Sequence, residues 1–117
     1  MENKWHIGNA GEDALKQRGW LLGHFISPSA DIRSTADVEV KWGIHAAGES
    51  RPEWTSGEKR TTLILLINGR FRVNLSVGTI NLEHHGDYAI WGPGIEHTWF
   101  AEENSTVLTV RWPSLPS

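Results

Sequence analysis

His97 is the side chain whose sequence surroundings most strongly suggest chemistry. It follows a turn signal, Gly92-Pro93-Gly94, within the stretch GDYAIWGPGIEHTW at residues 86–99. Glycine tolerates positive φ and proline fixes φ, so we expect a strand, a turn and a returning strand that opens on His97. This geometry would aim the imidazole at the space beside the turn. An imidazole there can contact a ligand, bind a metal or move a proton, and the alternative is a hydrogen-bonded structural histidine.

A dense run of charges precedes the strand expected at residues 61–67. Side chains two apart share one face of an extended chain, so Glu58, Arg60 and Thr62 should point into the interior with Ile64 and Leu66. A buried charge without a partner is costly. These groups should therefore pair with each other, with a ligand or with water.

Two interpretations of these charges stay open. One is a structural ion-pair network at the mouth of a barrel. The other is an anion clamp, because a guanidinium presents a fork of donors that matches a carboxylate or a phosphate. The candidate anion-binding residues are Arg51, Arg60 and Arg111, and Arg111 should share a face with Val107 and Thr109.

Tryptophan is unusually frequent, with seven residues against one Tyr and three Phe. One interpretation is that Trp fills the core and a dimer interface. The other is that Trp54, Trp91 and Trp99, which flank the candidate residues, line a ligand pocket as flat apolar walls that each carry one N–H donor.

A catalytic pair or a metal site would have few residues to use. In an acid–base pair, His97 would act with Glu53 or Glu58, and a metal could add His45 to the same set. Transition-metal sites need several N and O ligands, and no His-x-His pair occurs in the chain. The sequence therefore favours a site without a divalent metal, while leaving one open.

These candidates depend on a framework of short strands. Residues 9–18 predict one helix, with Asn9 as N-cap, acidic residues in the first turn and basic residues in the last. Strands are expected at 20–26, 38–44, 61–67, 71–77, 80–83, 88–91, 97–101 and 106–112, with loops at 27–36 and 46–57. Asn68-Gly69 is the strongest hairpin signal. Many short strands between Gly and Pro turns indicate an all-β sandwich or barrel.

The strand at 38–44 alternates between apolar and charged side chains. Val38, Val40, Trp42 and Ile44 share one face, and the charged residues between them share the other. We expect the apolar face to be buried and the charged face to be exposed. His45 then faces away from the core, unless a bulge at Gly43 reverses its direction.

Composition limits the classes of function. A chain of 117 residues predicts a single domain over 1–117. Net charge is −3 with both signs dispersed, so no nucleic-acid partner is expected. The longest apolar run, residues 63–67, is too short for a membrane span, and the first residues do not resemble a signal peptide. Together with the absence of cysteine, this favours a cytoplasmic protein without membrane contact.

The sequence resembles the cupin family in two regions. Residues 86–99 resemble the second cupin motif, in which a Gly, an apolar strand, a Pro, a Gly and a His lead into a small barrel. RTTLILLINGRF at residues 60–71 and RWPS at 111–114 resemble small single-domain bacterial cupins. The first motif of that family usually carries the metal ligands His-x-His and then a Glu. In this chain, residues 48–54 occupy the region of the His-x-His pair without any His, and Thr62 stands in the place of the Glu. Only His97 of the usual metal ligands carries over.

This resemblance implies a double-stranded β-helix, or jelly-roll barrel, with one short N-terminal helix. It places the helix, a strand and a loop in residues 1–36, the barrel core in 37–112 and a tail in 113–117. The family also implies a homodimer, for which the region of Trp5 and Trp20 could supply an interface.

Two functions follow as hypotheses. The first is a small-molecule-binding cupin of unknown specific function, with a small polar or anionic ligand inside the barrel. The second is a cupin enzyme, an isomerase, epimerase, lyase or cyclase that uses acid–base chemistry, with a metal-dependent oxygenase as a less favoured variant. The sequence prefers binding, because no two of the polar candidates have a spacing that a reaction demands.

Overall fold

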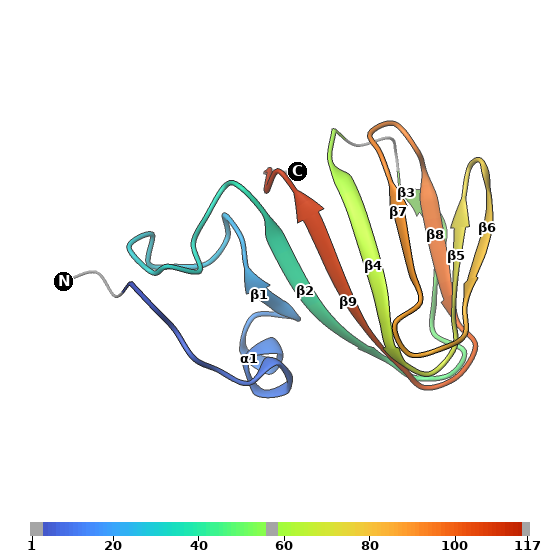
Figure 1. The fold of residues 1–117 in the computed structure, drawn as a ribbon, viewed down its shortest axis with the longest axis horizontal. Coiled ribbons are helices and arrows are strands. Elements are labelled where there is room, and N and C mark those ends of the chain that lie inside the picture. The colour runs from blue at the N-terminus through green and yellow to red at the C-terminus, as the bar shows by residue number, and fades with distance from the viewer. Residues whose placement is uncertain (1–3, 56–58, 116–117) are drawn as a thin grey trace.

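The computed structural model describes residues 4–55 and 59–115 of the chain as two antiparallel β-sheets and one short helix. The five-stranded sheet has the order β1-β2-β9-β4-β7 and the four-stranded sheet the order β3-β8-β5-β6 (Figure 1). The elements are α1 (Ala10–Lys16), β1 (Trp20–Leu22), β2 (Glu39–His45), β3 (Ser50–Thr55), β4 (Thr61–Asn68), β5 (Phe71–Leu75), β6 (Gly78–Leu82), β7 (Tyr88–Trp91), β8 (His97–Ala101) and β9 (Ser105–Trp112). This all-β architecture is the jelly-roll barrel that the sequence predicted.

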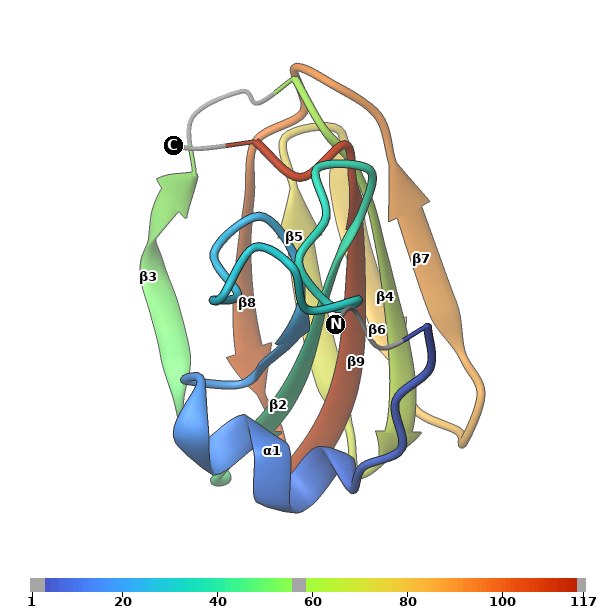
Figure 2. The ribbon, with the colours of Figure 1, turned by 90° about the vertical axis from the view of Figure 1, so that its left-hand side faces the viewer.

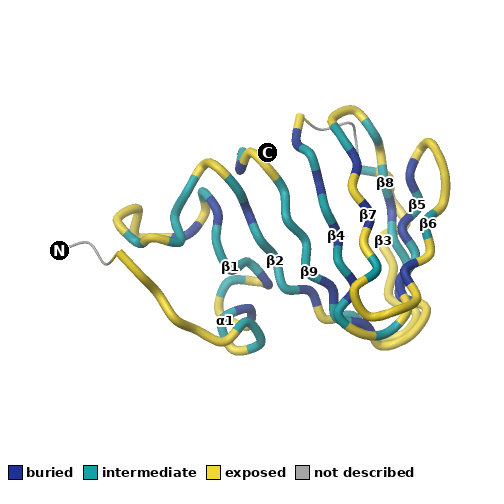
Figure 3. The backbone as a smooth tube through the Cα atoms, viewed as in Figure 1, coloured by how far each residue is buried: buried dark blue, intermediate teal, exposed yellow. Residues whose placement is uncertain are grey.

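The two sheets face each other and bury an apolar core between them. In Figure 2, β3 and β8 lie on one side of the molecule and β4 and β7 on the other. Buried side chains alternate with less buried ones along β4 and β5 (Figure 3). The core is centred on Leu66, Phe71, Val73, Ala101 and Val107, each at most 2% exposed. It fills the end of the barrel near the β4–β5 turn.

The predicted helix is confirmed, with slightly shorter bounds. The Asn9 side chain accepts a hydrogen bond from the backbone N–H of Glu12 at 3.1 Å, which satisfies one free donor of the first turn. Acidic residues in that turn and Lys16 in the last suit the helix dipole. The chain leaves the helix through Gly19 at a φ of +96°, and α1 packs against β1 and β2.

The prediction of a hairpin at Asn68-Gly69 is wrong. The turn is present, but β4 pairs with β7 and β9 whereas β5 pairs with β6 and β8, so the turn carries the chain from one sheet to the other. Gly69 is required there, because its φ is +97° and a Cβ would lie 2.4 Å from the carbonyl oxygen of Asn104. The Asn-Gly dipeptide therefore predicts a turn, but it does not predict which strands pair with each other on either side of that turn.

Residues 50–55 form a strand where the sequence predicted a loop. β3 lies at the edge of its sheet and pairs with β8 alone. Its side chains are mostly exposed and Pro52 lies within it, which an edge strand tolerates. The strand predicted at 20–26 is also shorter than expected, since β1 ends at Leu22. In the parts of the chain that the structure describes, no helix has the length and apolar character needed to cross a bilayer.

The prediction for the faces of β2 is also wrong. The charged set points inward: Glu39 is fully buried and Lys41 lines the cavity described below, whereas Ile44 is 65% exposed. Alternation defines two faces of a strand, but it does not say which of them meets the interior. Here the interior next to β2 is a polar cavity rather than the apolar core.

Candidate functional site

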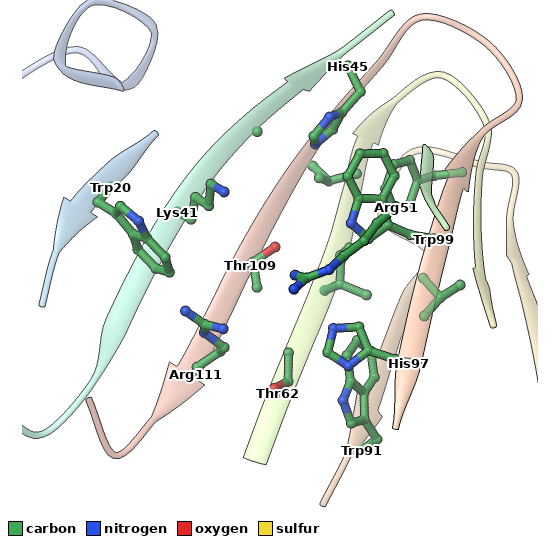
Figure 4. Close-up of a pocket in the computed structure, with 15 residues that line it drawn as sticks. Trp20, Lys41, His45, Arg51, Thr62, Trp91, His97, Trp99, Thr109 and Arg111 are labelled. Atoms are coloured by element: carbon green, nitrogen blue, oxygen red, sulfur yellow. The ribbon is translucent and has the colours of Figure 1, made fainter. Parts of the chain in front are cut away.

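A cavity of about 110 Å³ lies between the sheets and is partly open to solvent. The polar and aromatic side chains that line it are Trp20 from β1, Lys41 and His45 from β2, Arg51 from β3, Thr62 from β4, Phe71 from β5, Trp91 from β7, His97 and Trp99 from β8, and Thr109 and Arg111 from β9. Figure 4 shows that Lys41, Arg51 and Arg111 reach toward a common space next to Thr109. Eight of the strands therefore contribute to one site.

The pairing of β2 with β9 sets one wall of the cavity. Lys41 lies opposite Thr109 in the register, and Arg111 lies two residues farther along the same face of β9. Gly43 lies on the same strand as Lys41 and His45 and has no side chain. A Cβ at position 43 would lie only 2.8 Å from the His45 Nε2 atom. A side chain at position 43 would displace the imidazole, so glycine keeps this wall open.

The cavity has a surplus of positive charge. The Lys41 ammonium lies 5.4 Å, and the Arg111 guanidinium carbon 4.8 Å, from the centre of the Trp20 ring, so both cations face the same indole. Arg51 reaches the cavity from the edge strand β3, opposite Trp99 in the register. Among the described residues, no Asp or Glu lines the cavity.

Burial and neighbouring cations act together on Lys41. Desolvation is the main cause that lowers the pKa of its ammonium group, and the charges of Arg111, Arg51 and Arg18 lower it further. The protein thus places an amine where its positive charge is disfavoured. An anion bound in the cavity would offset this cost.

A buried carboxylate anchors the base of Arg111. Glu39 is fully buried and accepts hydrogen bonds from Arg60 Nη1 at 3.1 Å, from Ser114 Oγ at 3.1 Å and from Arg111 Nη2. Arg60 also donates to the carbonyl oxygen of Leu115 at 2.9 Å. The Glu39 carboxylate thus holds both guanidinium groups in place. The Arg111 Nε atom is buried and, within the described residues, lacks a hydrogen-bond acceptor.

Two histidines also line the cavity, His97 on β8 and His45 on β2. The His97 ring lies 4.9 Å from the Trp91 ring, and its Nε2 atom lies 3.5 Å from Thr55 Oγ1. The His45 ring lies 4.4 Å from Trp99. His45 Nδ1 donates to Glu49 Oε1 at 3.2 Å, because an ionised carboxylate only accepts.

Hydrogen bonds keep Glu49 ionised. The backbone N–H of Ala46 is the main cause that lowers the pKa of its carboxyl group, and His45 lowers it further. The bond from His45 Nδ1 to Glu49 fixes the tautomer of a neutral imidazole, so its Nε2 atom is an acceptor.

Most of the residues singled out from the sequence meet at this cavity. His45, Arg51, Thr62, Trp91, His97, Trp99 and Arg111 all line it. Arg60 is buried beside it and is held by Glu39, as in the structural ion-pair interpretation. Their roles in binding or catalysis stay predictions.

Of the two acidic partners predicted for His97, Glu53 does not line the cavity. Glu53 and Trp54 lie on β3, are exposed, and are not among the lining residues. Strand β3 has an irregular register between Arg51 and Thr55, so strict alternation from Arg51 does not hold there. Glu58 lies outside the described residues.

Lys41, Trp20, Thr109 and Glu39 belong to the site but were not predicted from the sequence. The sequence pattern around Glu39 and Lys41 is their alternation with apolar residues, and this pattern predicted that the two charged side chains face solvent. Trp20, predicted as part of a dimer interface, lines the cavity, while Trp5 is 73% exposed. The homodimer stays a prediction.

Within residues 4–55 and 59–115, no cluster of three or more His, Asp or Glu side chains could hold a metal ion. His45 and His97 both line the cavity, but the described residues add no carboxylate to them there. The cationic side chains are poor surroundings for a metal ion, because they repel it.

Comparison with solved structures identifies the fold. The structure of KdgF from Halomonas sp. matches with a TM-score of 0.61 at 21% identity, over 68% of this chain and 72% of that one. A cupin superfamily protein from Desulfitobacterium hafniense matches with a TM-score of 0.60 at 18% identity, over 67% and 69%. An RmlC-like cupin from Shewanella frigidimarina matches with a TM-score of 0.58 at 14% identity, over 67% and 68%. No protein-family model and no curated protein matches the sequence. The chain thus has the cupin fold, as the sequence resemblance implied.

Proposed function

We propose that this cupin-fold chain binds a small anionic molecule inside its barrel. The observation that carries the proposal is the charge of the cavity: Lys41, Arg51 and Arg111 line it, and no carboxylate among the described residues does. Of the three, Lys41 is half-buried and forms no ion pair with an Asp or Glu among the described residues. A half-buried charge without an anionic partner destabilises a fold, and an anionic ligand would offset this cost.

The side chains suit a carboxylate better than a bare ion. Arg51 and Arg111 line the cavity with guanidinium groups, which present forks of donors. Trp20, Trp91 and Trp99 add flat apolar walls for the carbon part of the ligand. An engineered apolar cavity of about 150 Å³ accommodates benzene, so a cavity of about 110 Å³ holds roughly six non-hydrogen atoms or fewer.

The alternative is an enzyme that works by acid–base chemistry. His45 on β2 and His97 on β8 supply imidazoles to the cavity. Of the two carboxylates that this alternative assigned to His97, Glu53 is exposed elsewhere on β3, and Glu58 lies outside the described residues. The cations that line the cavity are the observation that favours binding.

Calorimetry and thermal unfolding test the proposal. Acetate, lactate, pyruvate and phosphate are compared with acetamide and propanol, which have similar size but no charge. We expect saturable binding and a raised Tm with at least one anion and no effect with the neutral compounds. A ligand at 100 times its Kd adds about 2.7 kcal/mol to the free energy of unfolding.

Two arginine variants locate the effect. Arg51→Gln should abolish most of the anion-induced rise in Tm, because it removes a lining guanidinium. Arg72→Gln is the matched control, since Arg72 lies on β5 and pairs with Glu102 at 2.9 Å at the surface. If every anion leaves the Tm unchanged, or if both variants respond as the wild type does, the proposal is wrong.

A further inference from the structure

Lys41 differs from the other lysines of the chain. It points into the cavity from β2 and lies against the Trp20 ring. Lys4, Lys16 and Lys59 are exposed. Within residues 4–55 and 59–115, no Asp or Glu forms an ion pair with the Lys41 ammonium.

The groups around Lys41 favour its neutral form. Arg111 on β9 and Arg51 on β3 face the same space, and Arg18 precedes β1. His45 and His97 also line the cavity. Glu39, on the same strand, is engaged by two arginines and Ser114, so its charge is already shared. A neutral amine has a lone pair and is a nucleophile, whereas an ammonium is not.

From this arrangement we propose that Lys41 captures small 2-oxo acids as an imine, with the acid's carboxylate held by Arg51 and Arg111. The inference rests on the proposed function, because the same cations must first bind the carboxylate. In a 2-oxo acid the reactive carbonyl carbon is bonded directly to the carboxylate carbon. The ligand is thus short enough for a cavity in which the amine and the guanidinium groups converge (Figure 4).

The chemical step needs no oxidant and no cofactor. The Lys41 lone pair attacks the ketone carbon, a C–N bond forms, and the carbonyl oxygen becomes a hydroxyl group. That hydroxyl leaves as water, so the water carries away the carbonyl oxygen and both protons of the amine. The product is a neutral imine, which gains a positive charge if it binds a further proton from solvent.

Reductive trapping tests the inference on the intact chain. The protein is incubated at neutral pH with pyruvate and sodium cyanoborohydride, whose hydride converts the imine into a stable secondary amine. Peptide mass mapping then compares the four lysines. We expect Lys41 to be modified faster than Lys4, Lys16 and Lys59, because its lowered pKa leaves more of its amine in the neutral, nucleophilic form.

Two ligands and one variant separate the causes. Lactate has the same carboxylate without a ketone, so it should bind without labelling. Acetone has the ketone without a carboxylate, so it should label Lys41 slowly. Lys41→Arg removes the nucleophilic amine, so it should lose the adduct.

The outcomes distinguish this inference from the proposed function. Equal labelling of all four lysines, or no adduct while both pyruvate and lactate raise the Tm, overturns the inference and leaves anion binding in place. If neither acid binds, both fail. Selective labelling of Lys41 that disappears in Lys41→Arg supports both.

Discussion

Replacing Glu39 by Gln should be among the most damaging changes of one side-chain atom in this protein. Glu39 is fully buried, and its carboxylate accepts hydrogen bonds from Arg60, Arg111 and Ser114. The amide nitrogen of Gln would place a donor against at least one guanidinium donor. It would also remove the buried negative charge that Arg60 and Arg111 both contact.

The cost can be estimated from this geometry. Removing one partner of a buried ion pair destabilises a protein by about 3–5 kcal/mol. For a domain of this size, 1 kcal/mol corresponds to roughly 4 °C in Tm, so Glu39→Gln should lower the Tm by roughly 12–20 °C. If that variant does not fold, the triple variant Glu39→Leu, Arg60→Met, Arg111→Met should fold, because apolar replacement of a whole buried ion cluster is often neutral.

Urea and thermal unfolding provide the assay. Glu83→Gln is the matched control, because Glu83 pairs with Arg70 at 2.9 Å at an exposed site. Surface pairs contribute about 0–1 kcal/mol, so this control should unfold almost as the wild type does. The reasoning is refuted if Glu39→Gln loses no more stability than Glu83→Gln.

Three further changes have definite expected results. Lys41→Met should raise the stability of the ligand-free protein by about 1 kcal/mol and weaken anion binding. The folded state lowers the Lys41 pKa below its ordinary 10.5, so between that lowered pKa and 10.5 the unfolded chain binds more protons and the wild type gains stability as the pH rises. The stability advantage of Lys41→Met over the wild type should therefore shrink toward pH 10.5. A stability difference between the two proteins that is constant with pH, or negative, would contradict this. Gly69→Ala should destabilise the fold by more than about 1 kcal/mol and by more than Gly48→Ala, since both have positive φ but only position 69 has backbone where the Cβ would lie. Asp87→Asn should lower the Tm and flatten its fall in acid, because backbone N–H groups lower the pKa of Asp87 below 3.8 and its stabilising effect is lost as the pH falls through that lowered pKa; an unchanged acid profile would count against it.

Much of the fold follows from local signals in the sequence. β7 and β8 have the predicted bounds, and the Asn9 cap begins the helix as expected. These elements combine clear periodicity with strong Gly, Pro or capping residues at their ends. Pairing between strands could not be predicted in the same way, because the Asn68-Gly69 turn joins strands of different sheets.

The site was predicted less completely, for a physical reason. Of the residues in the anion-clamp interpretation, Arg51 and Arg111 line the cavity and Arg60 is held by Glu39 beside it; the predicted His97 also lines the cavity. Lys41 and Glu39 were assigned to the solvent, because charged residues on an alternating strand usually face water. At a polar binding cavity the charged side chains face the interior instead of water. A single sequence does not show which strand lines such a cavity.

The most direct test of the central claim is a titration of ¹⁵N-arginine-labelled protein with acetate and with pyruvate, followed by NMR at the Nε–Hε groups. We predict saturable shifts for Arg51 and Arg111, because both guanidinium groups line the cavity. Arg70 and Arg72, which pair with surface carboxylates, should not respond. If Arg51 and Arg111 stay unchanged, or only the surface arginines shift, the barrel is not an anion-binding site.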